Sequence, residues 1–165
     1  MRQHEPRRPL IYLAAPLFSE AELSYNLLLT GILERHVDVY LPQRDGGKLV
    51  DLVAKGVDVE VAYKSIFERD VEALKDADVL FLLMDGRSID EGAAFELGYA
   101  AALKKSCVGL QTDPRRLLPL GNNPMIQVSL KLIFRNFDEV AQWVENFSSQ
   151  RSNFFGQKTV RDAAY

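Results

Sequence analysis

Short apolar runs alternate with longer mixed segments along most of the chain, and this alternation predicts the order of its elements. We predict strands at residues 9–15, 37–41, 77–84, 106–111 and 132–134. The first run has little polar alternation, which is typical of a parallel sheet covered on both faces. We predict helices at residues 19–34, 58–76, 125–132 and 137–147, with a further helix opening at Asp90.

Capping residues and turn signals support these boundaries. Ser19 and Glu22 match a capping box, and Asp90 can cap the helix that follows the turn at residues 85–86. Residues 48–56 fit either a short helix or a mobile flap. Strands that alternate with helices predict a flavodoxin-like, doubly wound α/β sheet, with five parallel strands in the order 2-1-3-4-5 and helices on both faces.

The length of 165 residues suits a single domain with a real core. We expect residues 1–8, which are charged and contain proline, to form a flexible N-terminal tail. Residues 9–147 form the predicted domain. Residues 148–165 are polar with scattered aromatic side chains, and we expect this extension to pack on the domain or on a neighbouring subunit.

Composition excludes several classes of function. The chain has 23 acidic and 20 basic residues without a basic stripe, so we expect no nucleic-acid partner. No apolar run is long enough for a membrane span, and we expect no signal peptide. A single cysteine, Cys107, suits a reducing cytoplasm, and with His4 and His36 it makes no metal-ligand spacing. Neither phosphate-binding glycine signature is present, and we expect no metal and no cofactor.

Two carboxylates stand where apolar residues are expected, and a third, Asp90, opens the helix that contains one of them. Asp70 interrupts the apolar stripe of its helix, and Glu96 lies on a stripe of small and apolar residues in the helix that Asp90 opens. Such a sheet binds ligands at the carboxyl ends of its strands, where these acids converge if the predicted boundaries hold. Neighbouring acids in a dry pocket drive their pKa values apart. One can then attack a sugar carbon while another protonates the leaving group, as in the cleavage of a glycosidic bond.

Each candidate also has an ordinary structural interpretation. Asp90 is commonly just a helix cap, Asp70 can pair with Arg69 or Lys75, and Glu96 can be a buried ion-pair partner. The remaining candidates are by default core aromatics, a loop residue and a turn residue, namely Tyr12, Phe18, Gln43 and Asn123.

Taken together, these residues resemble the nucleoside 2-deoxyribosyltransferase family. The resemblance is sharpest at Asp90-Glu-Gly-Ala-Ala-Phe-Glu-Leu-Gly-Tyr-Ala100, within which the pattern Asp-x-Gly-x-x-x-Glu-x-Gly is the most specific part. It also includes residues 11–18, 67–70, 77–80 and 123–125, and so extends over about two-thirds of the chain. Some members carry Gly-Trp where this chain has Pro16 and Leu17, which leaves the preference for purines or pyrimidines open.

The resemblance implies base exchange on 2′-deoxyribonucleosides by double displacement. In this family the residue matching Glu96 is the nucleophile, which forms a covalent deoxyribosyl-enzyme as the base departs. A second free nucleobase, or more slowly water, then takes the sugar. The residues matching Asp70 and Asp90 hold the base and manage its proton, and the residue matching Tyr12 orients the nucleophile.

The resemblance also implies how the substrate is held. The residues matching Phe18 and Gln43 contact the base, and Gly92 belongs to the expected substrate-binding set. The residues matching Asn123 and Met125 reach into a neighbouring subunit's pocket. We therefore expect a homo-oligomer, either a dimer or a hexamer. We also expect the enzyme to be cytoplasmic.

Two other functions stay open. A related N-glycosidase acting on deoxynucleoside 5′-monophosphates would need anion ligands such as Ser19, Arg44 or Arg87. The segment 123–125 favours instead a free 5′ hydroxyl, and so a nucleoside. A non-catalytic nucleotide-binding module would bind without turnover, and it would tolerate Glu96→Gln.

Overall fold

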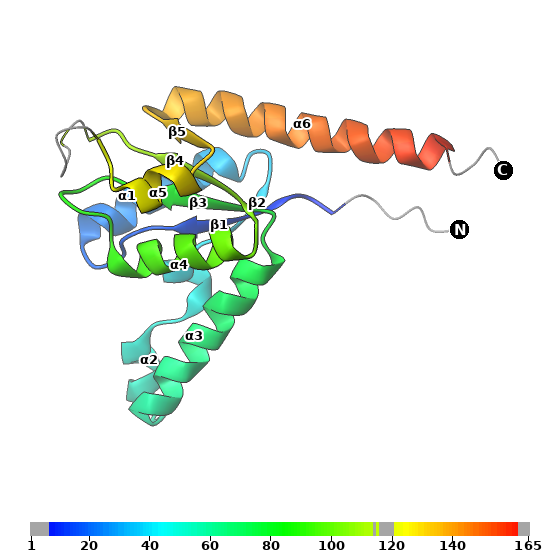
Figure 1. Ribbon diagram of the computed structural model, residues 1–165. Coiled ribbons are helices and arrows are strands. Elements are labelled where there is room, and N and C mark those ends of the chain that lie inside the picture. The colour runs from blue at the N-terminus through cyan, green and yellow to red at the C-terminus, as the bar shows by residue number, and fades with distance from the viewer. Residues whose placement is uncertain (1–6, 114, 116–120, 162–165) are drawn as a thin grey trace.

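Five parallel strands form one sheet in the order β2-β1-β3-β4-β5, which confirms the predicted topology (Figure 1). The computed structural model describes residues 7–113, 115 and 121–161, with the side chains of those up to residue 149. The strands are β1 (Leu10–Ala14), β2 (Asp38–Tyr40), β3 (Val79–Leu83), β4 (Ser106–Leu110) and β5 (Leu132–Phe134). Leu10 pairs with Asp38 and Ile11 with Val79, so β1 lies between β2 and β3.

Helices cover both faces of the sheet (Figure 1). They are α1 (Glu20–Leu33), α2 (Leu49–Ala54), α3 (Val59–Asp76), α4 (Glu91–Ala102), α5 (Pro124–Ser129) and α6 (Phe137–Arg161). One core cluster joins α1 and α6 to strand residues such as Ile11, Leu13 and Phe81. The other joins α3 and α4 to Tyr12 and Leu80, because successive side chains of a strand point to opposite faces.

The predicted helix starts are confirmed by their capping bonds. The backbone N–H of Ser19 donates to Glu22 Oε2 at 2.8 Å, and that of Glu22 donates to Ser19 Oγ at 3.3 Å. The carboxylates of Asp58 and Asp90 accept from backbone N–H groups in the first turns of α3 and α4. These bonds satisfy donors that a helix start otherwise leaves without a partner.

One segment differs from the element predicted for it, since residues predicted as a loop form a π-helical turn, η1 (Pro42–Gly46). Of the two alternatives for residues 48–56, the structure has the short helix, α2. Gly47 and Gly56 flank α2 with φ values of 88° and 84°, a conformation that glycine adopts without a steric penalty.

Two helix boundaries also differ. α5 begins at Pro124, which suits the first turn of a helix, and it ends before residue 132 because Leu132 pairs with β4. α6 runs beyond the predicted end at residue 147, and residues 148–161 contain no proline to stop it.

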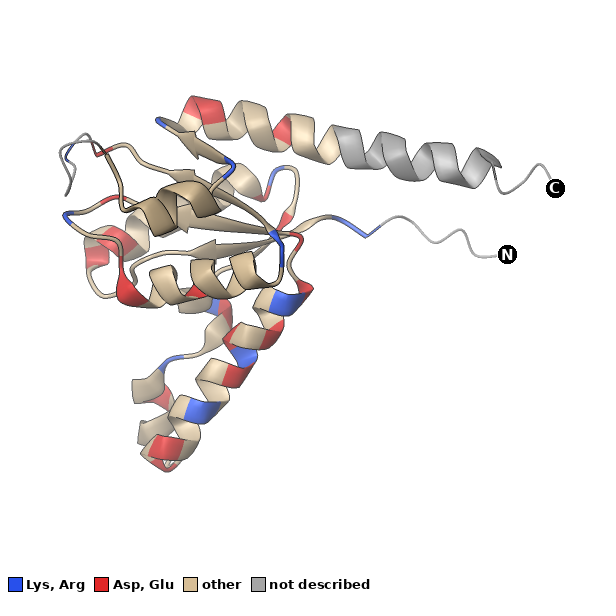
Figure 2. Cartoon of the chain, in the orientation of Figure 1, with Lys and Arg blue, Asp and Glu red and all other residues tan. Residues whose placement is uncertain are grey.

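The domain boundaries remain a prediction. Residues 1–6 lie outside the described residues, while Arg7 pairs with Asp78 at 3.1 Å and Arg8 bonds Glu34 O at 3.1 Å. The predicted docking of residues 148–165 depends on side chains that, from residue 150 on, lie outside what the structure describes. Charged residues are distributed along the length of α3 (Figure 2). In the part of the chain that the structure describes, no helix is long and apolar enough to cross a membrane.

Candidate active site

Glu96 is held from the sheet by Tyr12. Tyr12 lies in the middle of β1 and is completely buried, and its hydroxyl donates to Glu96 Oε1 at 2.5 Å. Glu96 lies in the second turn of α4 and is itself only partly exposed. The short charge-assisted bond fixes one oxygen of the carboxylate. The other oxygen, Oε2, makes no hydrogen bond to any residue that the structure describes.

Asp70 is held in the same manner by Tyr40, a residue that sequence reasoning did not select. Tyr40 is the last residue of β2 and pairs in register with Tyr12 of β1. The two rings stack with their centroids 5.3 Å apart and an interplanar angle of 19°. The Tyr40 hydroxyl donates to Asp70 Oδ1 at 2.7 Å. Two neighbouring strands therefore present two stacked phenols, each bonded to one carboxylate.

The turn η1 packs directly against Asp70. Gly46 is buried, and a Cβ atom added to it would lie 2.7 Å from Asp70 Oδ1, so a larger residue would displace the carboxylate. Arg69 donates through Nη1 to the carbonyl oxygen of Gly46 at 3.1 Å. The predicted alternative of an Asp70–Lys75 pair does not form, because Lys75 bonds Glu72 at 3.2 Å instead.

The protonation states of these groups are coupled. Burial raises the pKa of Glu96 to about 8, and the negative charges of Asp70 and Asp90 act in the same direction, against the Tyr12 hydrogen bond. Burial also raises the pKa of Asp70, while the Tyr40 bond and the Arg69 charge oppose it. Burial and Glu96 raise the pKa of the Tyr12 phenol, which therefore stays a donor. The cluster thus retains a proton near neutral pH.

Asp90 is the N-cap that the sequence predicted, and its negative charge helps to raise the pKa of Glu96. Its Oδ1 accepts from Ala93 N–H at 2.9 Å. A Cβ atom added to Gly92 would lie 3.1 Å from that same oxygen, so the glycine keeps the cap uncrowded. As the cap, Asp90 lies immediately before the first residue of α4. A role in catalysis for Asp90 stays a prediction.

A cavity of about 490 Å³ opens beside Asp70. Its walls come from the segment after β1, from α1, from η1 and α2, and from α3. The lining residues are Leu17, Phe18, Leu23, Pro42, Gln43, Gly47, Lys48, Leu49, Val50, Tyr63, Ile66 and Asp70. A mostly apolar cavity of this size, with a few polar groups, is typical of a site for a small organic ligand. The structure therefore brings Asp70, Phe18 and Gln43 together at one cavity.

Gln43 is fixed by a buried neighbour, Asn26, which no sequence pattern singles out. Asn26 is completely buried, and its Nδ2 donates to Pro16 O and to Gln43 Oε1, each at 2.8 Å. Gln43 Nε2 donates to Leu23 O at 3.1 Å. The amide that lines the cavity is thus held in one orientation by α1.

A family model for nucleoside 2-deoxyribosyltransferases matches residues 11–154. The chain belongs to the nucleoside 2-deoxyribosyltransferase family. None of the curated proteins matches the chain in sequence. Membership makes the protein an enzyme of glycosyl transfer or of the related N-glycosidic cleavage.

Solved structures agree with this family. A 2-deoxyribosyltransferase from the psychrotolerant bacterium Bacillus psychrosaccharolyticus is 26% identical with a TM-score of 0.66, over 80% of this chain and 90% of that one. A 2-desoxiribosyltransferase from Leishmania mexicana is 24% identical, with a TM-score of 0.58 over 83% and 97%. A CMP N-glycosidase from Clostridium botulinum is 17% identical, with a TM-score of 0.53 over 82% and 98%. The last two share the fold.

The residues that the family resemblance assigned to a neighbour's site lie apart from the cavity beside Asp70. Asn123 caps α5, and its Oδ1 accepts from Met125 N–H at 2.9 Å. Asn123 also lines a smaller pocket of about 250 Å³, together with Arg87 and Ser88. The Met125 side chain is 79% exposed. In the described part of its own chain, neither residue lines the cavity that Asp70 borders.

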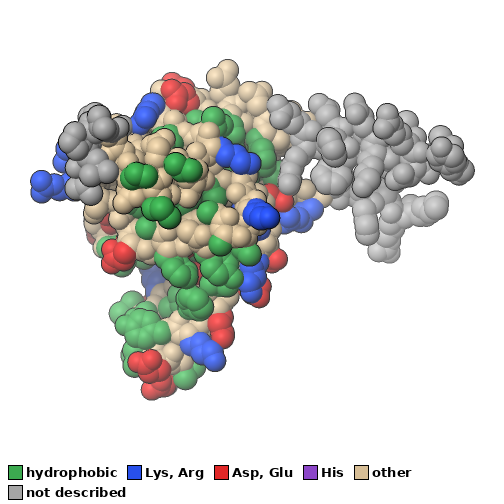
Figure 3. Space-filling view, viewed as in Figure 1, with side chains coloured by type: hydrophobic (Ala, Val, Ile, Leu, Met, Phe, Trp, Pro, Cys, Tyr) green, Lys and Arg blue, Asp and Glu red, His purple; other side chains and the backbone are tan. Residues whose placement is uncertain are grey.

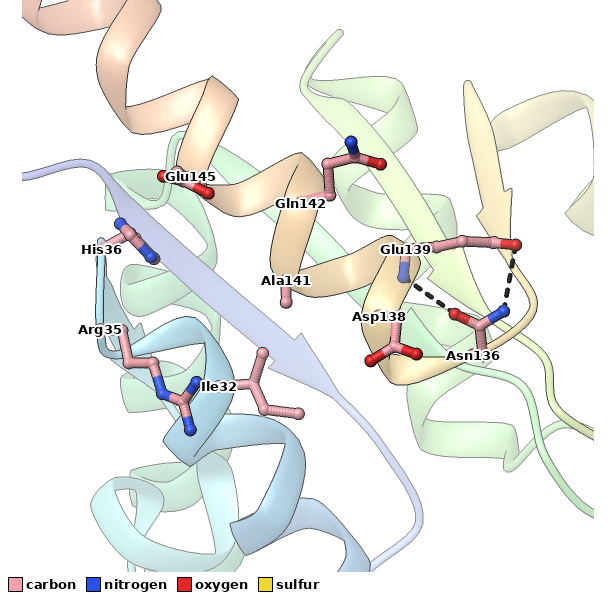
Figure 4. A pocket seen from close by; sticks show the side chains of 9 residues that line it. All are labelled: Ile32, Arg35, His36, Asn136, Asp138, Glu139, Ala141, Gln142 and Glu145. Atoms are coloured by element: carbon pink, nitrogen blue, oxygen red, sulfur yellow. Dashed lines mark hydrogen bonds between the residues drawn. The ribbon is translucent and has the colours of Figure 1, made fainter.

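A larger groove of about 560 Å³ lies between α1 and α6 and contains none of the three acids (Figure 4). Its lining is mostly polar and mixes opposite charges, with Arg35 from the segment after α1 and Glu145 from α6. Asn136 and Glu139 form the capping bonds of α6 there, at 2.9 and 3.2 Å. Among the residues that the structure describes, no group of three ligating side chains could hold a metal ion.

Sequence reasoning missed Tyr40, Gly46 and Asn26. Tyr40 had a usable signal, since it ends the strand next to Tyr12 and adjacent parallel strands align their side chains on the same face. Gly46 was one of two consecutive glycines, with nothing to show which one approaches an acid. Asn26 lies among apolar residues of α1, where a buried amide cannot be told from an exposed one without the structure.

Proposed function

We propose that the protein is a nucleoside 2-deoxyribosyltransferase, which exchanges the base of 2′-deoxyribonucleosides through a covalent deoxyribosyl–Glu96 intermediate. The observation that carries the proposal is the pair of carboxylates, Glu96 and Asp70, each held by a short bond from one of two stacked tyrosines, with Asp70 bordering a cavity. One acid can attack while the other manages the proton of the leaving base.

In the first step, Oε2 of ionised Glu96 attacks the anomeric carbon of the sugar. The carbon–nitrogen bond breaks, its electron pair goes to the base, and Asp70 supplies a proton to the base nitrogen. Tyr12 keeps Oε1 fixed, so that Oε2 is the attacking atom. A second base then attacks the same carbon and releases Glu96, while its own proton returns to the acid. Water in place of the base gives slow hydrolysis.

The cavity beside Asp70 is suited to the base. Phe18 offers an aromatic face and Gln43 an amide held in one orientation, while most of the remaining lining is apolar. A flat heterocycle gains from stacking and from a few placed hydrogen bonds. Exclusion of water by an apolar wall also favours transfer to a base over hydrolysis. Exchange of this kind would serve the salvage of free bases.

We further propose a homo-oligomer, a dimer or a hexamer, in which Asn123 and Met125 complete a neighbour's site. Large apolar side chains are exposed on three neighbouring helices, namely Phe67 on α3, Phe95 and Leu103 on α4, and Met125 and Val128 on α5. Apolar side chains gather over these helices on the face shown in Figure 3. The Phe67 and Phe95 rings lie 6.1 Å apart, so two of the helices contribute to one surface. Extended exposed apolar surface is typical of an association site.

A monophosphate N-glycosidase is the second candidate, and two of its three possible anion ligands are engaged within the chain. Ser19 caps α1, and Arg44 bonds Glu34 at 2.8 Å and Val39 O at 2.7 Å. Arg87 is exposed and makes no hydrogen bond within the described residues. This pattern favours a nucleoside over a nucleotide, because a 5′-phosphate needs several converging donors.

The proposal is tested by incubating the enzyme with a 2′-deoxynucleoside and a second free base, and following the new nucleoside by chromatography. We expect exchange by the unmodified enzyme and loss of exchange in Glu96→Gln and Glu96→Ala. Near-normal exchange in either variant would refute the role of Glu96. Faster cleavage of deoxynucleoside monophosphates than exchange between nucleosides would favour the N-glycosidase.

A further inference from the structure

We propose that Tyr40 is a positioning residue for Asp70, which fixes Oδ1 so that the proton passed to the departing base is carried on Oδ2. The inference rests on the proposed function and adds a residue to it. Tyr40 is not among the residues that the family resemblance selected.

Asp70 Oδ1 is enclosed by the protein. The Tyr40 hydroxyl lies 2.7 Å from it, and the backbone of Gly46 approaches so closely that an added Cβ would lie at 2.7 Å. The same added Cβ would lie 3.4 Å from the Tyr40 hydroxyl. Oδ1 therefore has no room for a substrate atom. Oδ2 makes no hydrogen bond to any residue that the structure describes, and Asp70 borders the cavity.

The Tyr40 hydroxyl donates to Asp70 Oδ1, and it is the only possible donor of this bond when Asp70 is ionised. Burial and the adjacent Asp70 keep the pKa of the phenol above its ordinary value, so the hydroxyl proton is retained. The stack on Tyr12 and the register between β1 and β2 fix the direction of the hydroxyl. A protonated carboxyl has one donor and one acceptor oxygen. With Oδ1 bonded to the Tyr40 hydroxyl and crowded by Gly46, we place the proton of Asp70 on Oδ2, the oxygen that stays open to a substrate.

This arrangement gives a balanced proton transfer. As the bond from the anomeric carbon to the base nitrogen breaks, its electron pair moves to the base and the Oδ2 proton moves to a base nitrogen. Glu96 Oε2 supplies the electron pair of the new bond to carbon. Asp70 is left as a carboxylate, which the Tyr40 hydroxyl stabilises through Oδ1. The return step reverses these transfers without another reagent.

The test is Tyr40→Phe, which keeps the stacked ring and removes the hydroxyl. Tyr25→Phe is the matched control, because Tyr25 is also a partly buried tyrosine, and among the described residues its hydroxyl bonds Thr112 Oγ1 at 3.4 Å and neither Asp70 nor Glu96. Both are assayed on two substrates that differ in the need for a proton. The pairs are 2′-deoxyguanosine with its N7-methyl derivative, or thymidine with 5-nitro-2′-deoxyuridine, according to which bases the unmodified enzyme accepts.

We expect Tyr40→Phe to lower kcat about 10- to 100-fold on the substrate whose base must be protonated, since positioned general acids contribute about 10²–10⁴. The substrate with the better leaving group should lose less than about 3-fold, and Tyr25→Phe should resemble the unmodified enzyme on both. The ratio between substrates is measured on one sample, so it does not depend on the fraction of folded variant. Equal losses on both substrates would overturn the inference.

A double-mutant cycle with Asp70→Asn gives an independent readout. If Tyr40 acts through Asp70, Tyr40→Phe should cause no further loss of kcat once Asp70 is an amide. Independent, multiplying losses would overturn the inference even though base exchange by the unmodified enzyme continued to support the proposed function. Failure of the unmodified enzyme to exchange or cleave any of these substrates would instead remove the proposed function, and the inference with it.

Discussion

The acid cluster and the surface around it are built in opposite ways. Tyr12, Tyr40, Glu96 and Asp70 are buried or partly buried, and short bonds from the sheet hold both acids. The flanking residues that would meet the base or a second subunit are open, since Phe18 is 78% exposed and Val50 72%. The difference indicates that the chemistry is organised before substrate arrives, whereas recognition is completed by the base and by a partner.

The largest effect is expected from a substitution at the centre of the buried acid cluster, at Glu96. Glu96→Gln should lower base exchange by about 10³-fold or more, because the amide cannot form the covalent bond. Chromatographic rates measure this loss, and circular dichroism checks the fold. Glu91→Gln is the matched control, since Glu91 is an exposed acid in the first turn of the same helix. A loss in the control as large as in Glu96→Gln would contradict the assignment.

The same substitution should stabilise the protein. The folded pKa of Glu96 is raised from 4.5 to about 8, so ionisation costs the wild type stability as pH rises through this interval. At pH 8, Glu96→Gln should raise the free energy of unfolding by about 1–2 kcal/mol, with a smaller gain near pH 5. Urea titrations at both pH values measure the difference. A variant that is less stable than wild type at pH 8 would contradict this environment for Glu96.

Substitutions in the exposed region should lower activity by affecting the sites that neighbouring subunits share. Asn123→Ala is expected to lower exchange about 10- to 100-fold, as the loss of a positioning contact commonly does. If Asn123 serves a neighbour's site, a mixture of Asn123→Ala and Glu96→Gln chains, refolded together, should recover part of the activity, because some sites then contain both intact residues. Absence of recovery in mixed oligomers that are shown to form would refute the shared site.

A charge placed on the apolar surface should also separate the subunits. Phe95→Glu is expected to reduce the mass measured by light scattering, since an unpaired carboxylate in an apolar interface is strongly unfavourable. Leu28→Glu is the control, because Leu28 is a comparably exposed residue on α1. An equal change in mass for both variants, or no change for Phe95→Glu, would count against this surface.

The protonation state of the nucleophile predicts a pH dependence. Attack requires ionised Glu96, whose pKa in the free enzyme is about 8, so kcat/KM should fall about 10-fold per pH unit well below that value. Initial exchange rates between pH 5.5 and 9 measure this limb. A profile that is already level from pH 5.5 to 7 would show that the carboxylate is ionised in the free enzyme.

The smallest effect is expected where the two regions meet. Asn26→Ala removes the bond to Gln43 Oε1 and leaves the amide held only through Leu23 O, so it should raise KM about 3- to 10-fold with a smaller change in kcat. Ser24→Ala, at an exposed position of the same helix, is the control. A change in kcat alone would indicate that Asn26 acts on the chemistry and not on the binding of the base.

The sequence predicts a feature of the structure only where neighbouring residues form a recognisable pattern. Apolar runs and caps were sufficient for the strand order and for the placement of Asp90 and Glu96 on α4. The strand ends place Tyr40 beside Tyr12, but nothing local links Tyr40 to Asp70, which lies 30 residues away. The π-helical turn that brings Gly46 to Asp70 has no sequence signature. The residue-by-residue register between β1 and β2 and the close approach of Gly46 to Asp70 are therefore known only from the structure.

Mass spectrometry of enzyme quenched during turnover tests the central claim most directly. A 2-deoxyribosyl adduct on the peptide containing Glu96 is the predicted result, and the Glu96→Gln enzyme should lack it. Exchange that continues with no adduct at any quench time, or with the sugar attached to Asp70 or Asp90 in place of Glu96, would contradict it.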